Sequence, residues 1–120
     1  MHEMGIANSV LDAVRSETHR FPDGHIYKVG VRIGELAGVN PDAMSFCFEA
    51  LVRGTELEPL ALEIEYCPRR YQCRACGHSY TAAEDLICPK CGVTESQFLE
   101  GDELEIAYLE VENGARAAGT

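Results

Sequence analysis

Hydrophobic residues recur at two different spacings in the first third of the chain. Between residues 4 and 20 they repeat every three or four positions, which is typical of one face of an α-helix. The residues on this face are Ala7, Val10, Leu11 and Val14. After a Pro-Asp-Gly turn at residues 22–24, apolar residues alternate with polar residues or glycine from Tyr27 to Ile33. This alternation predicts a strand with one buried face.

A second helix is predicted after this strand. Pro41 and Asp42 suit the first turn of a helix, and Gly54 is suited to ending one. The predicted apolar face of this helix consists of Met44, Cys47, Phe48 and Leu51. We therefore interpret Cys47 as a core residue and not as a ligand.

Two further strands are predicted on either side of a cysteine-rich region. Apolar residues at alternate positions predict strands at residues 60–66 and 104–108, and Glu103 and Glu105 are expected to face solvent. The apolar residues change parity at Leu109, which predicts a β-bulge near Ala107 to Leu109.

The cysteine-rich region is therefore interpreted as an insertion between two strands of the same pattern. The most economical arrangement pairs those two strands directly and lets the inserted region project from their ends. The expected fold is α+β, with one discontinuous domain over residues 1–68 and 100–120. A small zinc-ribbon domain is expected over residues 69–99.

Four cysteines give the inserted region its chemistry. They form two Cys-x-x-Cys pairs, namely Cys73 with Cys76 and Cys88 with Cys91. Zn²⁺ binds four thiolates as a tetrahedron, and each pair presents two sulfurs to one ion. Glycines 77 and 92 follow the pairs, so the backbone can curl under the sulfurs and donate N–H bonds to them. We predict a structural zinc site, and iron in a rubredoxin-like site is the competing interpretation.

Two disulfides are a weaker interpretation of the same cysteines. The sequence shows no signal-peptide pattern and no apolar stretch that could span a membrane. We therefore expect a cytoplasmic protein without a membrane partner, whose thiols stay reduced and available for metal.

The charge of the chain argues against nucleic acid as a partner. Acidic residues number 20 against 10 basic ones, which gives a net charge of -10. A nucleic-acid-binding ribbon needs a basic face for the phosphates. The basic cluster of this chain is limited to Arg69, Arg70 and Arg74. An acidic surface suits a metal-handling protein or a basic protein partner, and it also simply favours solubility.

The first three residues are Met1, His2 and Glu3. A large side chain at position two should prevent removal of the initiator methionine. The α-amine of Met1 and the amide and imidazole nitrogens of His2 can then chelate one ion, and the amide or carboxylate of Glu3 can complete a plane. Ni(II) and Cu(II) favour such square-planar coordination. Amides that open a helix have no intrahelical acceptor, which leaves them available. On this chemistry alone, a chance occurrence of His2 remains the alternative.

These features in combination resemble the HypA/HybF family. The resemblance rests on the Met-His-Glu-Met start, the long helix after it, residues 29–35, residues 46–49 and the late cysteine pairs, and it extends to about residue 112. It implies two helices packed on a three-stranded sheet, with an inserted four-cysteine zinc ribbon. It also implies a nickel metallochaperone for [NiFe]-hydrogenase maturation, with a structural Zn²⁺ and a labile, transported Ni²⁺.

The resemblance further implies a nickel site and partners. Family members bind Ni(II) through residues that correspond to His2 and Glu3, so the discontinuous domain is expected to be the nickel-binding one. They transfer the metal with the GTPase HypB to the hydrogenase large subunit. Some members carry an acidic residue near position 40, where this chain has Asn40 and then Asp42.

Other residues have weaker claims. His78 could enter the metal site if a cysteine left, although a role beside the site or in solvent is the simpler interpretation. Cys67 could be a redox thiol or a transient ligand, or it could pack at a strand end. The sequence shows no phosphate loop and no recognisable nucleophile with its base, so we do not expect an enzyme. The rival functions are a zinc-ribbon adaptor without labile metal and a nucleic-acid-binding ribbon.

Overall fold

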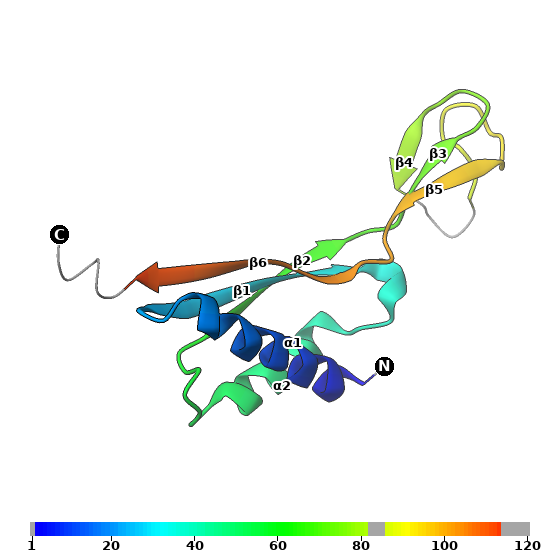
Figure 1. Cartoon of the computed structure of the whole chain (residues 1–120). Helices are drawn as coiled ribbons and strands as arrows, with labels where there is room; N and C mark the ends of the chain where they lie inside the picture. Colours follow the sequence, from blue (N-terminus) through cyan, green and yellow to red (C-terminus); the bar gives the residue numbers. More distant parts are fainter. Residues whose placement is uncertain (1, 82–85, 114–120) are drawn as a thin grey trace.

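The computed structural model describes residues 2–81 and 86–113, which form two helices and two small sheets (Figure 1). The helices are α1 (Glu3–Glu17) and α2 (Pro41–Val52). Short 3-10 turns follow α1, at η1 (Thr18–Arg20), and precede α2, at η2 (Glu35–Ala37). The strands are β1 (Gly24–Gly34), β2 (Ala61–Cys67), β3 (Arg70–Cys73), β4 (Ser79–Thr81), β5 (Ser96–Glu100) and β6 (Leu104–Asn113).

Both helices cover the same face of the larger sheet (Figure 1). The four residues predicted for the apolar face of α1 are all buried. They meet Val29, Val31 and Ile33 of β1, and Met44 and Phe48 of α2, in one continuous core. The predicted fold class, two helices on a three-stranded sheet with an inserted cysteine ribbon, is therefore confirmed.

The strand order of the larger sheet differs from the expectation. We expected β2 and β6 to pair with each other, but the order is β2-β1-β6, so β1 lies between them. β1 runs parallel to β2 and antiparallel to β6. The connection through α2 places β1 and β2 side by side and parallel. The segment that leads into β6 is bound to the end of β1, because Gly34 N donates to the carbonyl of Glu103 and Leu36 N to that of Gly101, at 2.7 Å each, so β6 begins beside β1 and not beside β2. The similar alternation of apolar residues in β2 and β6 therefore did not indicate that these two strands pair.

The predicted bulge in β6 is confirmed. Gly30 pairs with Tyr108, but Val31 pairs with Ile106, so Ala107 has no partner in the register. The extra residue places Ile106 on the helix side and Tyr108 on the opposite, open face. There the ring of Tyr108 lies across Gly30, where an added Cβ would come within 2.0 Å of the ring. The Tyr108 hydroxyl then reaches Glu63 on β2 and donates a hydrogen bond to it.

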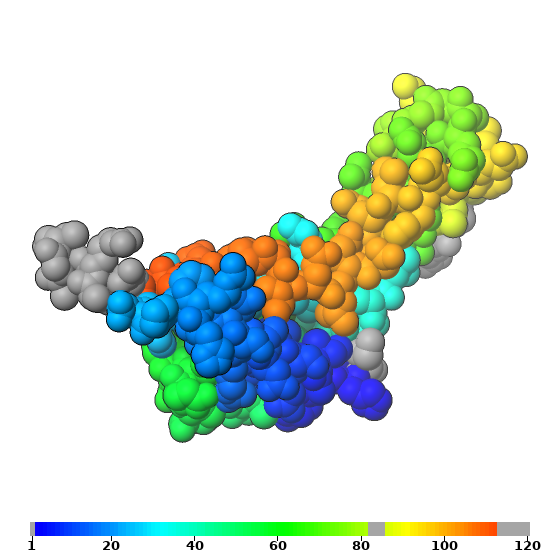
Figure 2. Space-filling view, viewed as in Figure 1, coloured from blue at the N-terminus to red at the C-terminus, as the bar shows by residue number. Residues whose placement is uncertain are grey.

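The second sheet has the order β4-β3-β5 and holds the four cysteines beside it. Its small core contains Cys73, Tyr80 and Cys88, with Tyr71 packed against them. Tyr71 stacks on Tyr80 with the ring centroids 6.3 Å apart. This ribbon projects from one end of the larger sheet and gives the molecule an elongated shape, as Figure 2 shows.

The two chain segments that enter and leave the ribbon are held at the end of β1. Gly101 has φ 128°, and an added Cβ there would lie 2.5 Å from Cα of Arg69 on the entering segment. The carbonyl of Gly101 accepts from Leu36 N at 2.7 Å. The carboxylate of Glu35 accepts from Arg69 N at 3.1 Å. Both connections of the ribbon are thus tied to η2, immediately after β1.

Candidate metal centres

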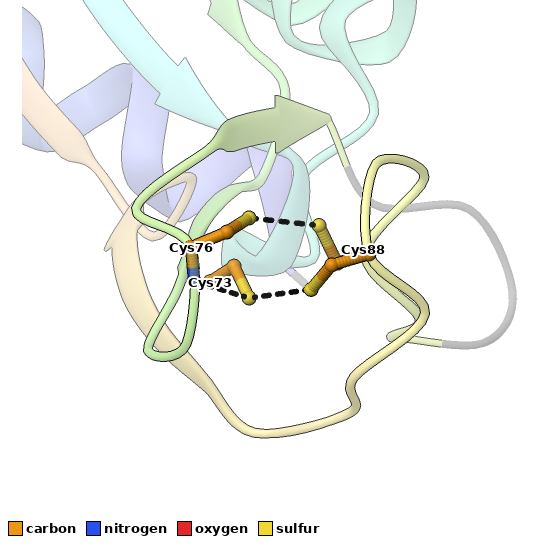
Figure 3. Close-up of side chains that lie close together, drawn as sticks. Cys73, Cys76 and Cys88 are labelled. Carbon is orange, nitrogen blue, oxygen red and sulfur yellow. Dashed lines mark hydrogen bonds between the residues drawn. The ribbon is translucent and has the colours of Figure 1, made fainter.

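The four predicted cysteines converge in the ribbon. Their sulfur atoms all lie within 4.8 Å of one another, and they are the group of metal-ligating side chains found among residues 2–81 and 86–113. Sγ of Cys73 lies 3.5 Å from Sγ of Cys91, and Sγ of Cys76 lies 3.7 Å from Sγ of Cys88. Figure 3 shows Cys76 and Cys88 pointing toward each other from opposite sides of the cluster.

The backbone after each cysteine pair makes this convergence possible. Gly77 and Gly92 both have φ 80°, a left-handed conformation that favours glycine. In each case the glycine N–H donates to the carbonyl of the first cysteine, at 3.0 Å for Gly77 and Cys73 and at 2.9 Å for Gly92 and Cys88. The two pairs therefore close identical tight turns that aim their sulfurs at one point.

Backbone N–H groups also favour negative charge on Cys73. The N–H of Cys76 points at Sγ of Cys73 from 3.5 Å and is the main cause that lowers the pKa of Cys73 to about 6. Burial acts in the opposite direction, and the N–H of Ala75 adds to the lowering at 3.4 Å. A thiolate is the form that binds metal. The cluster thus favours the thiolate of Cys73 by itself, and a divalent cation would favour thiolates at all four cysteines.

The sulfur spacing fits a tetrahedral metal ion. A metal–sulfur bond of about 2.3 Å implies sulfur–sulfur distances of about 3.8 Å around a tetrahedral Zn²⁺. The two measured separations, 3.5 and 3.7 Å, are near this value. A disulfide needs about 2.05 Å, and all six cysteines are free thiols. The sulfurs of Cys73, Cys76, Cys88 and Cys91 are therefore arranged as the four ligands of one tetrahedral metal ion would be.

His78 lies beside this site and is not one of its four ligands. Its ring stacks on Tyr80 with the centroids 6.3 Å apart and the planes at 14°. Its carbonyl accepts a hydrogen bond from Cys73 N at 2.8 Å. The prediction of a role outside the ligand set agrees with this position, and the backbone of His78 helps to fix Cys73.

The N-terminal residues lie at the start of α1, far along the chain from the ribbon. His2 is exposed and is the residue before the helix, and its carbonyl accepts from Ile6 N at 3.0 Å. Glu3 opens the helix, and Met1 lies outside the described residues. The structure therefore places two of the three predicted nickel-binding residues together at an accessible helix end.

The carboxylate of Glu3 makes a contact that the sequence does not indicate. Oε2 of Glu3 accepts a hydrogen bond from Asn40 N at 3.1 Å. This bond is the main cause that lowers the pKa of Glu3, and the N–H of Glu3 itself contributes next. Asn40 also caps α2, because its Oδ1 accepts from Ala43 N at 3.1 Å. Asn before Pro-Asp is a recognisable helix start, but nothing in the sequence pairs it with Glu3.

The remaining cysteines lie outside the cluster. Cys47 is half-buried on α2 and packs against the main core, as predicted. Cys67 is buried at the end of β2, opposite Gly34 of β1. Burial is the main cause that raises the pKa of the Cys67 thiol, with the charge of Glu103 next. This environment suits strand-end packing and disfavours a reactive thiolate.

Comparison with known proteins places this arrangement in a family. A family model described as hydrogenase/urease nickel incorporation, metallochaperone, hypA matches residues 1–111. The chain belongs to the HypA family. HypA proteins are metallochaperones and maturation factors, not catalysts. No helix of the described residues is both long and apolar enough to cross a membrane.

Relatives align with the HypA-family chain over nearly its full length. The hydrogenase maturation factor HypA of Streptomyces avermitilis is 38% identical over 123 residues, which cover 100% of this chain and 94% of that protein. The same factor of Geobacter metallireducens is 39% identical over 113 residues, which cover 93% of this chain and 100% of that protein.

Solved structures of the family share the fold. The solution structure of the Ni metallochaperone HypA from Helicobacter pylori matches with a TM-score of 0.56 and 26% identity, and the match covers 92% of this chain and 97% of that one. A second solution structure of a HypA protein matches with a TM-score of 0.63 and 22% identity, over 92% of this chain and 95% of that one.

Proposed function

We propose that the chain binds Ni(II) at its N-terminus and delivers it for [NiFe]-hydrogenase maturation. The donors are the Met1 amine, the amide and imidazole nitrogens of His2, and the amide nitrogen of Glu3. The observation that carries this assignment is the exposed position of His2 directly before α1. Amides at a helix start lack intrahelical acceptors, and four nitrogens in a plane suit Ni(II). Coordination by the two amide nitrogens releases their protons.

The contact between Glu3 and Asn40 favours the backbone nitrogen of Glu3 over its carboxylate as the nickel ligand. The carboxylate already accepts a hydrogen bond from Asn40 N at 3.1 Å. Binding of nickel by the carboxylate would remove or weaken this bond, whereas binding by the backbone nitrogen removes only the contribution of the Glu3 N–H and leaves the bond from Asn40 N in place. The carboxylate then offsets the positive charge that the ion brings to the start of α1.

A structural zinc ion is the second part of the proposal. Cys73, Cys76, Cys88 and Cys91 would hold it, and its role is to fold the small ribbon around the cluster. On this assignment residues 69–99 act as a zinc-ribbon domain, and residues 1–68 and 100–120 as the nickel-binding domain. The reduced thiols suit a cytoplasmic location.

Delivery requires an accessible and exchangeable site. A terminal site with few protein ligands leaves room for a partner to enter the coordination sphere and take the ion by ligand exchange. We propose the GTPase HypB and the hydrogenase large subunit as the partners, and no nucleic acid, in keeping with the net charge of -10.

The deciding experiment is a Ni(II) titration of untagged protein, followed by absorption spectroscopy. The native protein should bind one Ni(II) in the square-planar form, and His2→Ala should abolish that spectrum while the zinc content stays the same. His19→Ala is the matched control, because His19 is also exposed but lies at the far end of α1. One added N-terminal glycine should also remove the site.

The contrary results are equally clear. If the extended protein binds nickel as well as the native one, the Met1 amine is not a ligand. If His2→Ala binds normally, the N-terminal site is wrong and an adaptor without labile metal becomes the better description. Metal analysis of the purified protein, which separates zinc from iron, tests the ribbon independently.

A further inference from the structure

The outer edge of β6 is an unusual feature of the larger sheet. With the order β2-β1-β6, no strand within residues 2–81 and 86–113 covers the side of β6 that faces away from β1. Its backbone N–H and C=O groups on that side form a row of unpaired donors and acceptors. On the helix side of β6, Leu104 and Ile106 remain exposed, at 42% and 39%.

An apolar groove runs along the helix side of this edge. It has a volume of about 290 Å³, and Ile6 and Val10 of α1 face Leu104 and Ile106 of β6 across it. Ser9 and Glu105 also line it. Val31 of β1 lies at its base. Side chains that entered this groove would leave water on contact with four aliphatic residues, and such burial is the main driving force for association.

The other side of the same edge is acidic. Glu105 and Glu65 both contact Arg32, at 2.8 and 3.4 Å, so two carboxylates share one guanidinium. Glu110 accepts a hydrogen bond at 2.7 Å from Tyr27, which is neutral. The cations of this face are Arg32 and Lys28, and Lys28 lies 3.7 Å from Glu63. The carboxylates of Glu63, Glu65, Glu105 and Glu110 outnumber them, so negative charge exceeds positive charge on this face.

We propose that the β6 edge binds an extended segment of a partner protein as an added strand. The segment would carry apolar side chains at alternate positions, which fill the groove, and Lys or Arg between them, which meet the acidic side. Main-chain hydrogen bonds to β6 would give affinity, and the alternation would give specificity. This surface is separate from the proposed nickel site.

A second copy of the chain fits this edge less well. An antiparallel pair of β6 strands would bring together two segments that each carry Glu105, Glu110 and Glu112. Like charges on facing strands destabilise the pair. A basic partner segment would neutralise part of the negative charge on β6, whereas a second copy of the chain would double it.

The test uses the full-length protein and a synthetic ten-residue peptide of alternating lysine and valine. Binding is followed by amide NMR spectra and by hydrogen exchange. The peptide should shift and protect amides of β6, from Leu104 to Glu110. Ile106→Lys should weaken binding about tenfold or more, because it places a positive charge beside the groove. Phe46→Lys is the control with the same charge change, since Phe46 is 73% exposed on α2, and it should bind as the native protein does.

A second variant and two control peptides complete the test. Glu105→Gln keeps the size of the side chain and removes one negative charge from the acidic side, so it should weaken binding about threefold at low salt. A glutamate–valine peptide and a peptide with the same lysines and valines in two blocks should not bind. The proposal is overturned if β6 amides do not respond, if either control peptide binds equally well, or if Ile106→Lys has no effect. Sedimentation showing a native dimer that Ile106→Lys dissociates would also overturn it, in favour of a second copy.

Discussion

The carboxylate of Glu3 and the backbone N–H of Asn40 form a hydrogen bond of 3.1 Å between the starts of α1 and α2. Asn40 also caps α2 through its side chain. Asn40 therefore caps α2 with its side chain and binds the Glu3 side chain at the start of α1 with its backbone N–H. The proposed nickel donors lie at this junction, so their geometry depends on two segments that are distant in the sequence.

We predict that Glu3→Gln retains most nickel binding. Glutamine keeps the backbone nitrogen of residue 3 and an oxygen that can accept from Asn40 N, and it loses only the charge. The Ni(II) affinity measured by titration should fall far less than in His2→Ala. A loss as severe as that of His2→Ala would show that the carboxylate, and not the amide nitrogen, binds the ion.

The same contact should titrate in acid. The Asn40 N–H lowers the pKa of Glu3 below its ordinary value of 4.5, so the ionised carboxylate is favoured in the folded state. The bond therefore stabilises the folded state fully above pH 4.5, and this stability is lost as the pH falls through the lowered pKa of Glu3. The Asn40 amide resonance should shift with a midpoint below 4.5, and Glu3→Gln should abolish the shift. A midpoint at or above 4.5 would contradict the contact.

Loss of one metal ligand should affect the ribbon first. In Cys73→Ser we expect the metal content to fall and the amide dispersion of residues 70–100 to collapse, while helical circular dichroism persists, because the core between the helices and the larger sheet contains none of the four cysteines. Cys47→Ala is the control. It should keep both metals and cost on the order of 1 kcal/mol of stability, as for a small, partly buried group. Global loss of helix in Cys73→Ser would refute a separable ribbon.

Any side chain at position 30 should destabilise the protein while Tyr108 is present. An added Cβ would lie 2.0 Å from the Tyr108 ring, so Gly30→Ala should destabilise the protein by about 1–3 kcal/mol through overpacking. Urea denaturation measures this loss. The same substitution in a Tyr108→Ala background should cost much less, because the ring that it meets is gone. Equal costs in the two backgrounds would mean that the ring does not cause the effect.

The sequence was most informative where a structure depends on neighbouring residues. The burial of Val10 and Val14 follows from helical spacing, and the convergence of the cysteines follows from two local turns with glycines at 77 and 92. The bulge at Ala107 was also visible as a change in parity. These features follow from periodicity or from a turn of a few residues.

Features that depend on distant segments were missed or misjudged. The central position of β1 depends both on the crossover through α2 and on the bonds that hold the segment before β6 at the end of β1, and the similar patterns of β2 and β6 indicate neither. The bond between Glu3 and Asn40 joins residues 37 positions apart, and no periodicity signals it. The groove beside Ile106 exists because α1 and β6 leave space between them, which no single segment reveals.

The order β2-β1-β6 gives the ribbon a further consequence for the stability of the sheet. The end of β2 and the start of β6 are two strand spacings apart, about 10 Å, so residues 68–103 form the arch that crosses the end of β1. While the ribbon is folded, its two ends lie together at Arg69 and Gly101, so residues 68–103 act as a short connection between β2 and β6. If the cysteines lose their ion and the ribbon unfolds, the arch becomes a flexible loop several times longer. The added entropy of loop closure is about 1.5 kcal/mol, so the larger sheet loses stability although no atom in its core has changed.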